Sequence, residues 1–338
     1  MTGPALAVVG DRLLTDLVEV TDDLAALDGR GHWAVVIPFA GPPVCARFAT
    51  VRPARPWRGR PWVGVDRAAW RTSLDREAFT AGIEAIRSAI GRGDVYQVNL
   101  TRVLAAPLPA GADVAALGAA LAAGNPAPFS AVVRLPDHGV HVASASPERY
   151  LQRQGPRVWS SPIKGTAAVA DGFLPKDRAE NVMIVDLVRN DLGRVCDWGS
   201  VTVPGLLEVE PHPGLVHLVS TVEGRLRDGL GWPELVAATF PPGSVTGAPK
   251  IAALELIDRL ETADRELYCG AVGWVDADRR EGALNVAIRT FWFAGGEIRF
   301  GTGGGITWDS DPDGEWAETE LKAARLLRVA ANDAVPVP

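Results

Sequence analysis

Short β-favouring segments separated by glycine and proline recur along this chain of 338 residues. Ala5–Val9, Trp33–Phe39 and Val44–Val51 are rich in apolar and β-branched residues and are bounded by residues that end strands. Phe129–Leu135 and Val140–Ser144 predict a hairpin. Further strands are expected at Asp94–Thr101, Val201–Val203, Leu206–Val209, His217–Arg225, Cys269–Val275, Leu284–Phe293 and Glu297–Gly301. Such a pattern, with helices between the strands, favours the α+β class and a layered α/β sandwich with antiparallel-rich sheets and helices outside.

Helical spacing of apolar residues marks the segments between these strands. A first helix is expected to begin at Ser73, a residue type that caps helices, and to end before Gly91. The other expected helices are Asp113–Ala123, Asp177–Leu192, Pro233–Phe240, Ile251–Leu260 and Glu315–Ala331. The sequence shows no repeat and no linker, so we interpret residues 1–70 as a short β-rich N-terminal segment packed on a catalytic core of residues 71–333.

Charge and cysteine usage narrow the classes of function. The formal net charge is −7 and no block of lysine or arginine occurs, which argues against a nucleic-acid partner. Cys45, Cys196 and Cys269 lie far apart and match no metal-binding spacing, so we expect free thiols in a reducing compartment. The N-terminus lacks a signal pattern, and the apolar runs are too short to span a bilayer. These features predict a cytoplasmic protein without a membrane partner.

The segment Ser161–Thr166, which reads Ser-Pro-Ile-Lys-Gly-Thr, holds a lysine between a proline and a glycine. Proline fixes its own φ and glycine tolerates positive φ, so Lys164 is expected at a strand end or a tight turn that aims its side chain. A solvated surface lysine is the ordinary alternative. A buried lysine that loses its proton can instead act as a nucleophile.

Three glutamates are candidates for a metal site. Glu180 lies in the first turn of its expected helix, and Glu315 and Glu318 share one face of the last helix because they are three residues apart. Magnesium prefers oxygen ligands and takes one or two protein carboxylates, with water and substrate completing its shell. The alternative is purely structural, because acidic residues favour helix N-termini and Glu318 can pair with Lys322.

Several polar positions are candidates for binding an anion. Gly303-Gly-Gly offers backbone amides after a strand, and Thr246 precedes a helix start at Pro249. Arg289 stands alone among apolar residues of its strand, where it either receives a carboxylate or is paired structurally. Gln97 shares one strand face with Asn99, which faces either solvent or a site.

Taken together, these segments resemble the chorismate-utilising enzymes. The resemblance covers roughly residues 74–331 in family order and rests on Asp94–Thr101, Ser146–Leu151, Pro162–Ala167, Glu180–Gly193, His217–Arg225, Gly243–Lys250, Tyr268–Val272, Asn285–Thr290 and Gly303–Lys322. It implies a single large sandwich that holds chorismate in a deep cleft with Mg²⁺. Members that add water carry a general-base lysine where this chain has Gln97, and aminodeoxychorismate synthases carry the lysine seen here as Lys164.

The resemblance also implies roles for individual residues. Glu148 is the general acid for the departing hydroxyl at C4 of chorismate, and Lys164 attacks C2 to form an adduct that ammonia resolves at C4. Glu180, Glu315 and Glu318 are implied as the magnesium ligands. The implied substrate-binding residues are Gln97, Thr166, His217, Thr246, Tyr268, Arg289, Gly303, Gly305 and Lys322.

The expected product is therefore 4-amino-4-deoxychorismate, made by a transferase on the route to 4-aminobenzoate and folate. None of the three cysteines lies in a nucleophile elbow, so ammonia is expected from a separate glutamine amidotransferase subunit or from solution. Feedback binding of tryptophan is not expected, because residues 1–70 lack the sequence pattern of the tryptophan pocket found in relatives. The alternatives are an anthranilate synthase-type large subunit and a catalytically silent, anion-binding partner subunit.

Overall fold

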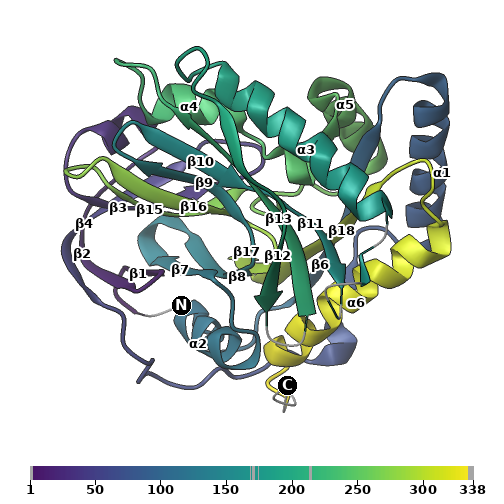
Figure 1. Cartoon of the computed structure of the whole chain (residues 1–338). Helices are drawn as coiled ribbons and strands as arrows, with labels where there is room; N and C mark the ends of the chain where they lie inside the picture. Colours follow the sequence, from purple (N-terminus) through teal and green to yellow (C-terminus); the bar gives the residue numbers. More distant parts are fainter. Residues whose placement is uncertain (1–2, 168, 170–171, 174, 213–214, 334–338) are drawn as a thin grey trace.

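The computed structural model describes residues 3–167, 169, 172–173, 175–212 and 215–333, and Figure 1 shows their arrangement. The first nine strands are β1 (Leu6–Val9), β2 (Arg12–Thr21), β3 (His32–Ile37), β4 (Val44–Pro53), β5 (Arg71–Thr72), β6 (Gln97–Pro107), β7 (Phe129–Leu135), β8 (Val140–Ser146) and β9 (Arg149–Gln154). The others are β10 (Arg157–Ser161), β11 (Ile163–Ala167), β12 (Thr202–His212), β13 (Leu215–Arg225), β14 (Gly247–Ala248), β15 (Ala271–Asp276), β16 (Glu281–Val286), β17 (Thr290–Ala294) and β18 (Glu297–Ile306).

All pairings between these strands are antiparallel, and hydrogen bonds connect them into one curled sheet. One half runs β6, β18, β17, β8 and β7, and the other runs β15, β16, β9, β10, β13 and β12. Strands β1, β2, β4 and β3 join the halves, because β1 pairs with β7 and β3 pairs with β15. The expected antiparallel-rich sandwich is confirmed, and the N-terminal strands contribute to the same sheet.

The helices lie outside this sheet (Figure 1). Asp75 caps α1, so this helix begins after Asp75 and not at Ser73 as expected. Asp113 and Asp311 cap α2 and α6 in the same way, each accepting a backbone N–H with its carboxylate. The helix bounds are α1 (Arg76–Arg92), α2 (Val114–Gly124), α3 (Pro175–Gly193), α4 (Trp232–Thr239), α5 (Lys250–Leu260) and α6 (Pro312–Ala330).

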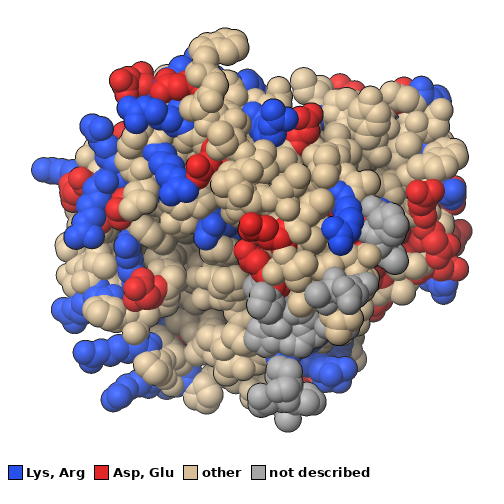
Figure 2. Space-filling view, in the orientation of Figure 1, with Lys and Arg blue, Asp and Glu red and all other residues tan. Residues whose placement is uncertain are grey.

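Acidic and basic side chains alternate on the surface. Figure 2 shows arginine and lysine interspersed with aspartate and glutamate along the left edge of the view, where the ends of β2, β3 and β4 lie in Figure 1. Cys45, Cys196 and Cys269 are free, as expected, and all three are buried. No helix among the described residues is long and apolar enough to cross a membrane.

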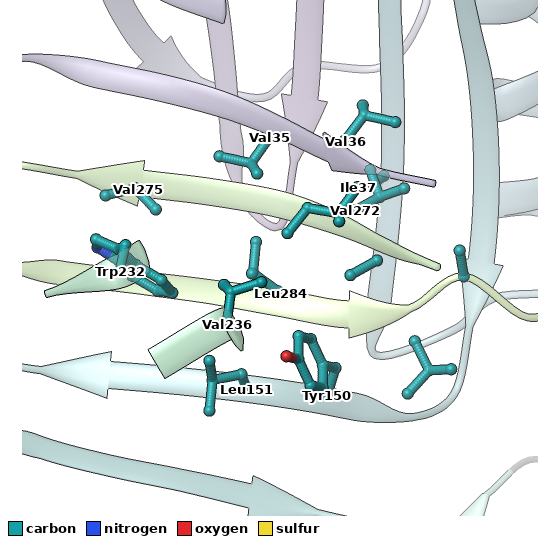
Figure 3. Close-up of a cluster of buried hydrophobic side chains, with 14 of the residues drawn as sticks. Val35, Val36, Ile37, Tyr150, Leu151, Trp232, Val236, Val272, Val275 and Leu284 are labelled. Atoms are coloured by element: carbon teal, nitrogen blue, oxygen red, sulfur yellow. The ribbon is translucent and has the colours of Figure 1, made fainter. Parts of the chain in front are cut away.

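The main core lies where α4 packs over the joined strands. Figure 3 shows Trp232 and Val236 of α4 in one cluster with Leu284 of β16 and Leu151 of β9. Trp232, Leu284 and Leu151 are at most 1% exposed, so each buries nearly its whole side chain. Because burying a large apolar side chain contributes roughly 1.5–3 kcal/mol, this cluster fixes β9, and with it the turn from β8 that carries Glu148.

Candidate active site

Glu148 lies in the turn between β8 and β9 and is held by the hydroxyl of Ser146, which accepts its backbone N–H at 3.2 Å. Ser146 also donates to the carbonyl of Val286 at 2.6 Å, which anchors the turn to β16. Glu148 is 4% exposed, and burial raises the pKa of its carboxyl from 4.5 to about 7. A hydrogen bond from Ser244, the charge of Lys164 and the amide of Ile163 oppose that rise. A carboxyl with this pKa can carry a proton near neutral pH.

Lys164 lies on β11, and its side chain is only 12% exposed. Its Nζ atom lies 4.0 Å from Oε2 of Glu180 on α3. The following residue, Gly165, has φ 93°, and a Cβ there would lie 3.0 Å from Cβ of Asp177. Only glycine adopts this conformation readily. Strand β11 therefore holds the lysine mostly buried, and the alternative of a solvated surface lysine is wrong.

Three elements converge at Lys164. A Cβ atom on Gly305 of β18 would lie 2.0 Å from Nε2 of Gln97 and 3.1 Å from Nζ of Lys164. Gln97 is 1% exposed on β6, so the solvent-facing alternative for this strand face is also wrong. Its Oε1 atom is buried without a hydrogen-bond partner among the described residues. A buried acceptor without a hydrogen bond destabilises the folded state. A hydrogen-bond donor on a bound molecule would remove this destabilisation.

The three glutamates are close enough to influence one another but are also engaged by neighbours. Ser310 donates to Oε1 of Glu315 at 2.7 Å, and Nζ of Lys322 lies 2.6 Å from Oε1 of Glu318. Within the described ranges, no group of three His, Cys, Asp or Glu side chains forms a ready-made metal cage. The donor chemistry still suits magnesium, which binds through one or two carboxylates and keeps several waters.

Burial and nearby lysines set the charge of these glutamates. Burial raises the pKa of Glu180 against the attraction of Lys164, and it raises the pKa of Glu315 against the hydrogen bond from Ser310. Burial also acts on Glu318, but Lys322 and two other lysines outweigh it and hold the pKa of this carboxyl below its ordinary value. Burial thus favours the protonated form of Glu180 and Glu315, whereas neighbouring lysines favour the carboxylate form of Glu318.

The glycine-rich end of β18 offers backbone amides to the site. Gly303 and Gly305 lie opposite Thr101 and Asn99 of β6. The N–H groups of Thr101 and Asn99 donate to Glu261 and to the carbonyl of Thr246, away from β18. Thr101 and Asn99 therefore form non-hydrogen-bonded pairs with Gly303 and Gly305. In such pairs both residues direct their backbone N–H and C=O groups away from the partner strand, so the amides of Gly303 and Gly305 point away from β6. Nζ of Lys322 reaches the outward carbonyl of Gly303 at 3.0 Å.

Arg289 interrupts the strand expected over Leu284–Phe293. The chain leaves β16 after Val286 and re-enters β17 at Thr290, with Arg289 at φ 51°. A non-glycine residue with positive φ is uncommon and clusters at functional sites. Burial lowers the pKa of its guanidinium, and no acidic side chain in the described part of the chain forms an ion pair with it. The structure therefore does not support the alternative of a structurally paired arginine.

Tyr268 precedes Cys269, which donates its backbone N–H to the carbonyl of Ala287 at 3.1 Å. The ring covers Gly301 of β18 so closely that a Cβ there would lie 2.0 Å from it. Burial raises the pKa of the Tyr268 hydroxyl well above its ordinary range, so the group is neutral. The groups that act on this hydroxyl include Cys269, Arg265 and Glu261.

The structure places three further expected substrate-binding residues, Thr246, His217 and Thr166, by their local contacts. Thr246 is fully buried and donates its hydroxyl to the carbonyl of Pro242 at 3.1 Å, so its role here is in the turn before β14. His217 is 2% exposed and pairs with Thr166 across β13 and β11. The side chain of Thr166 lies outside the part that the structure describes.

Several neighbours of the site were missed by sequence reasoning. Ser244 hydrogen-bonds Glu148, Ser310 hydrogen-bonds Glu315, and the charge of Lys176 acts on all three glutamates. Ser244 does lie in Gly243–Lys250, one of the segments that carry the family resemblance. The chain contains four lysines, and every one of them faces a carboxylate of the site or of its immediate surroundings: Lys164, Lys176, Lys250 and Lys322.

Known proteins share both the sequence and the fold. Aminodeoxychorismate synthase component 1 of Klebsiella aerogenes is 42% identical over 273 residues, which cover 77% of this chain and 59% of that protein. An anthranilate synthase component 1 of Haloarcula marismortui is 40% identical over 287 residues, covering 81% of this chain and 58% of that protein. This chain thus spans about three fifths of the length of both relatives.

A solved structure agrees with the fold. Anthranilate synthase component I of Streptococcus pneumoniae superposes with a TM-score of 0.79 at 23% identity, covering 97% of this chain and 93% of that one. The family model described as chorismate binding enzyme matches residues 63–328, which include every site residue named above. The chain therefore belongs to the family of chorismate binding enzymes.

Proposed function

We propose that this chain converts chorismate and ammonia to 4-amino-4-deoxychorismate. The observation that carries the proposal is the convergence of Lys164 and Gln97 at Gly305, with the buried carboxyl of Glu148 under the influence of the same lysine. Gln97 cannot act as a general base for water, whereas Lys164 supplies an amine beside an acid. The relative from Klebsiella aerogenes bears the name of this activity.

Glu148 and Lys164 divide the chemistry in this proposal. The lysine nitrogen forms a bond to C2 of chorismate, the two ring double bonds shift, and the C4–O bond breaks as Glu148 gives its proton to the leaving hydroxyl. Ammonia then forms the C4–N bond, and the electron pair of the C2–N bond returns to Lys164. The proton lost by the new ammonium centre restores Glu148. The net change exchanges a hydroxyl for an amine and releases water.

The remaining polar groups would hold the two carboxylates of the substrate. Arg289, the hydroxyl of Tyr268 and the amides of Gly303 and Gly305 supply positive charge and hydrogen-bond donors for one of them. Glu180, Glu315 and Glu318 would hold Mg²⁺ beside the ring carboxylate. A bound magnesium ion supplies the positive charge that neutralises that carboxylate.

Ammonia would come from a separate glutamine amidotransferase subunit in this proposal. The printed name "component 1" of the Klebsiella aerogenes relative supports a partner component. Production of 4-aminobenzoate for folate would follow from the same product after a lyase step. A second candidate, synthesis of anthranilate, is favoured by the 40% identity to the Haloarcula marismortui protein.

A product assay separates these candidates. The purified chain is incubated with chorismate, Mg²⁺ and ammonium, with and without an aminodeoxychorismate lyase, and products are separated by chromatography. We expect 4-aminobenzoate only with the lyase, and Lys164→Ala to abolish it or divert the enzyme to anthranilate. Arg189→Ala, which removes an exposed cation from α3, is the control and should behave as the wild type. Anthranilate from the wild type, or full activity of Lys164→Ala, would show that the proposal is wrong.

A further inference from the structure

A small cavity lies directly behind Glu148. Its volume is about 20 Å³, and its walls include Glu148, Ser244, Tyr150, Val188 and Asp191. A cavity of this size holds one water-sized molecule, provided that two or more polar groups line it. Chorismate is far too large for this space. The cavity can therefore admit only a small polar molecule.

Two acidic residues line this cavity. One is Glu148, whose carboxyl is under the influence of the charge of Lys164. The other is Asp191, which accepts a hydrogen bond from Nζ of Lys250 at 2.7 Å. The side chain of Asp191 is 8% exposed and that of Lys250 is 18% exposed, so this ion pair keeps some access to solvent. The lining thus includes both the proposed general acid and one partner of a partly exposed ion pair.

Further hydrogen-bonding groups line the cavity. The hydroxyl of Tyr150 lies 2.6 Å from Oγ1 of Thr239, whose own proton goes to the carbonyl of Leu235. Tyr150 therefore donates to Thr239 and keeps lone pairs that can accept a further hydrogen bond. The carboxylate of Asp191 is a second acceptor. Ammonia, with three N–H donors and one acceptor, suits such a lining.

We propose that ammonia reaches the reacting carbon through this cavity, passing from the Asp191–Lys250 pair to Glu148. The inference rests on the proposed amination and adds the entry route of its second substrate. The cavity delivers ammonia at the carboxyl that has just lost its proton. There the nitrogen forms the C4–N bond, the C2–N bond to Lys164 breaks with its electron pair on the lysine, and Glu148 takes the released proton.

Changing the size of the cavity tests the route in both directions. Val188 lines the cavity on α3, and Val185, one turn earlier and equally buried in the core, does not. Val188→Ile narrows the cavity and Val188→Ala widens it, with Val185→Ile and Val185→Ala as matched controls. The assay measures the KM for ammonia, the KM for chorismate, and the ratio of kcat/KM for methylamine to that for ammonia.

We expect Val188→Ile to raise the KM for ammonia about 10-fold while the KM for chorismate changes less than about twofold. Val188→Ala should raise the methylamine-to-ammonia ratio about 10-fold, because a wider path admits the larger amine. General loss of stability cannot produce these opposite effects. If the Val188 variants match the Val185 variants, the route is wrong although the amination stands. If the wild type aminates nothing, the proposed function itself is wrong.

Discussion

Replacing Glu148 by glutamine should stabilise the folded protein at alkaline pH. Burial raises the pKa of this carboxyl from 4.5 to about 7, so the folded state holds the proton more tightly than the unfolded state does. Stability is therefore lost as the pH rises from about 4.5 to about 7. A pKa difference of about 2.5 corresponds to about 3 kcal/mol, since each unit contributes about 1.4 kcal/mol. Glutamine has no proton to lose and still accepts the hydrogen bonds of Ser244 and the Ile163 amide.

The assay is urea unfolding of the wild type and of Glu148→Gln at about pH 5 and about pH 8. The free-energy difference between the two proteins should shift by about 2.5 kcal/mol in favour of the variant between these pH values, because part of the loss already occurs below pH 5. Other titrating groups cancel in this comparison because both proteins share them. Glu255→Gln removes an exposed carboxyl of α5 and serves as the control. If Glu148→Gln and the wild type respond equally to pH, the reasoning about the buried carboxyl is refuted.

Three further predictions concern activity and ligand binding. In a pH–rate profile kcat/KM should fall as the pH rises through about 7, because Glu148 then loses the proton it donates; a flat profile from pH 6 to 8 would contradict this role. Gly305→Ala should lower kcat/KM by about 100-fold, since its Cβ would lie 2.0 Å from Nε2 of Gln97, whereas Gly193→Ala, which meets open space, should have little effect; equal activities of the two variants would refute the crowding. Added Mg²⁺ should raise the Tm of the wild type in differential scanning fluorimetry but not that of Glu315→Gln, and an equal rise in both would exclude Glu315 as a ligand.

The helices were more predictable than the strands. Apolar spacing located α3 and α6 to within about three residues of their observed ends, because local sequence decides helical periodicity. The strand expected at Leu284–Phe293 is instead broken around Arg289, and the two strands expected after Val201 form the single irregular strand β12 with Leu207 at φ 57°. These features depend on pairing with distant strands, which a local pattern does not contain.

The site was predictable only where residues keep their role within a family. The resemblance brought Lys164, Glu148 and Gln97 together, and the structure places Lys164 with Gln97 at Gly305 and under mutual electrostatic influence with Glu148. Alternation along β6 could not decide between solvent and site for Gln97, because a strand covered on both faces looks the same as a half-exposed one. Ser244 was missed as the partner of Glu148, since 96 residues of sequence separate two groups that only the sheet brings together.

The lysines described above have a practical consequence for handling the protein. Of 34 basic residues four are lysines, so the side chains carry only four primary amines, and all four lie in or beside the site. Arginine, which provides the rest of the positive charge, does not react with amine-directed reagents under mild conditions. Among side chains, coupling through activated esters, reductive methylation or aldehyde cross-linking at lysine would therefore be confined to the functional region. The same scarcity makes a mass-spectrometric search for a trapped Lys164 adduct unusually simple, with few competing sites to resolve.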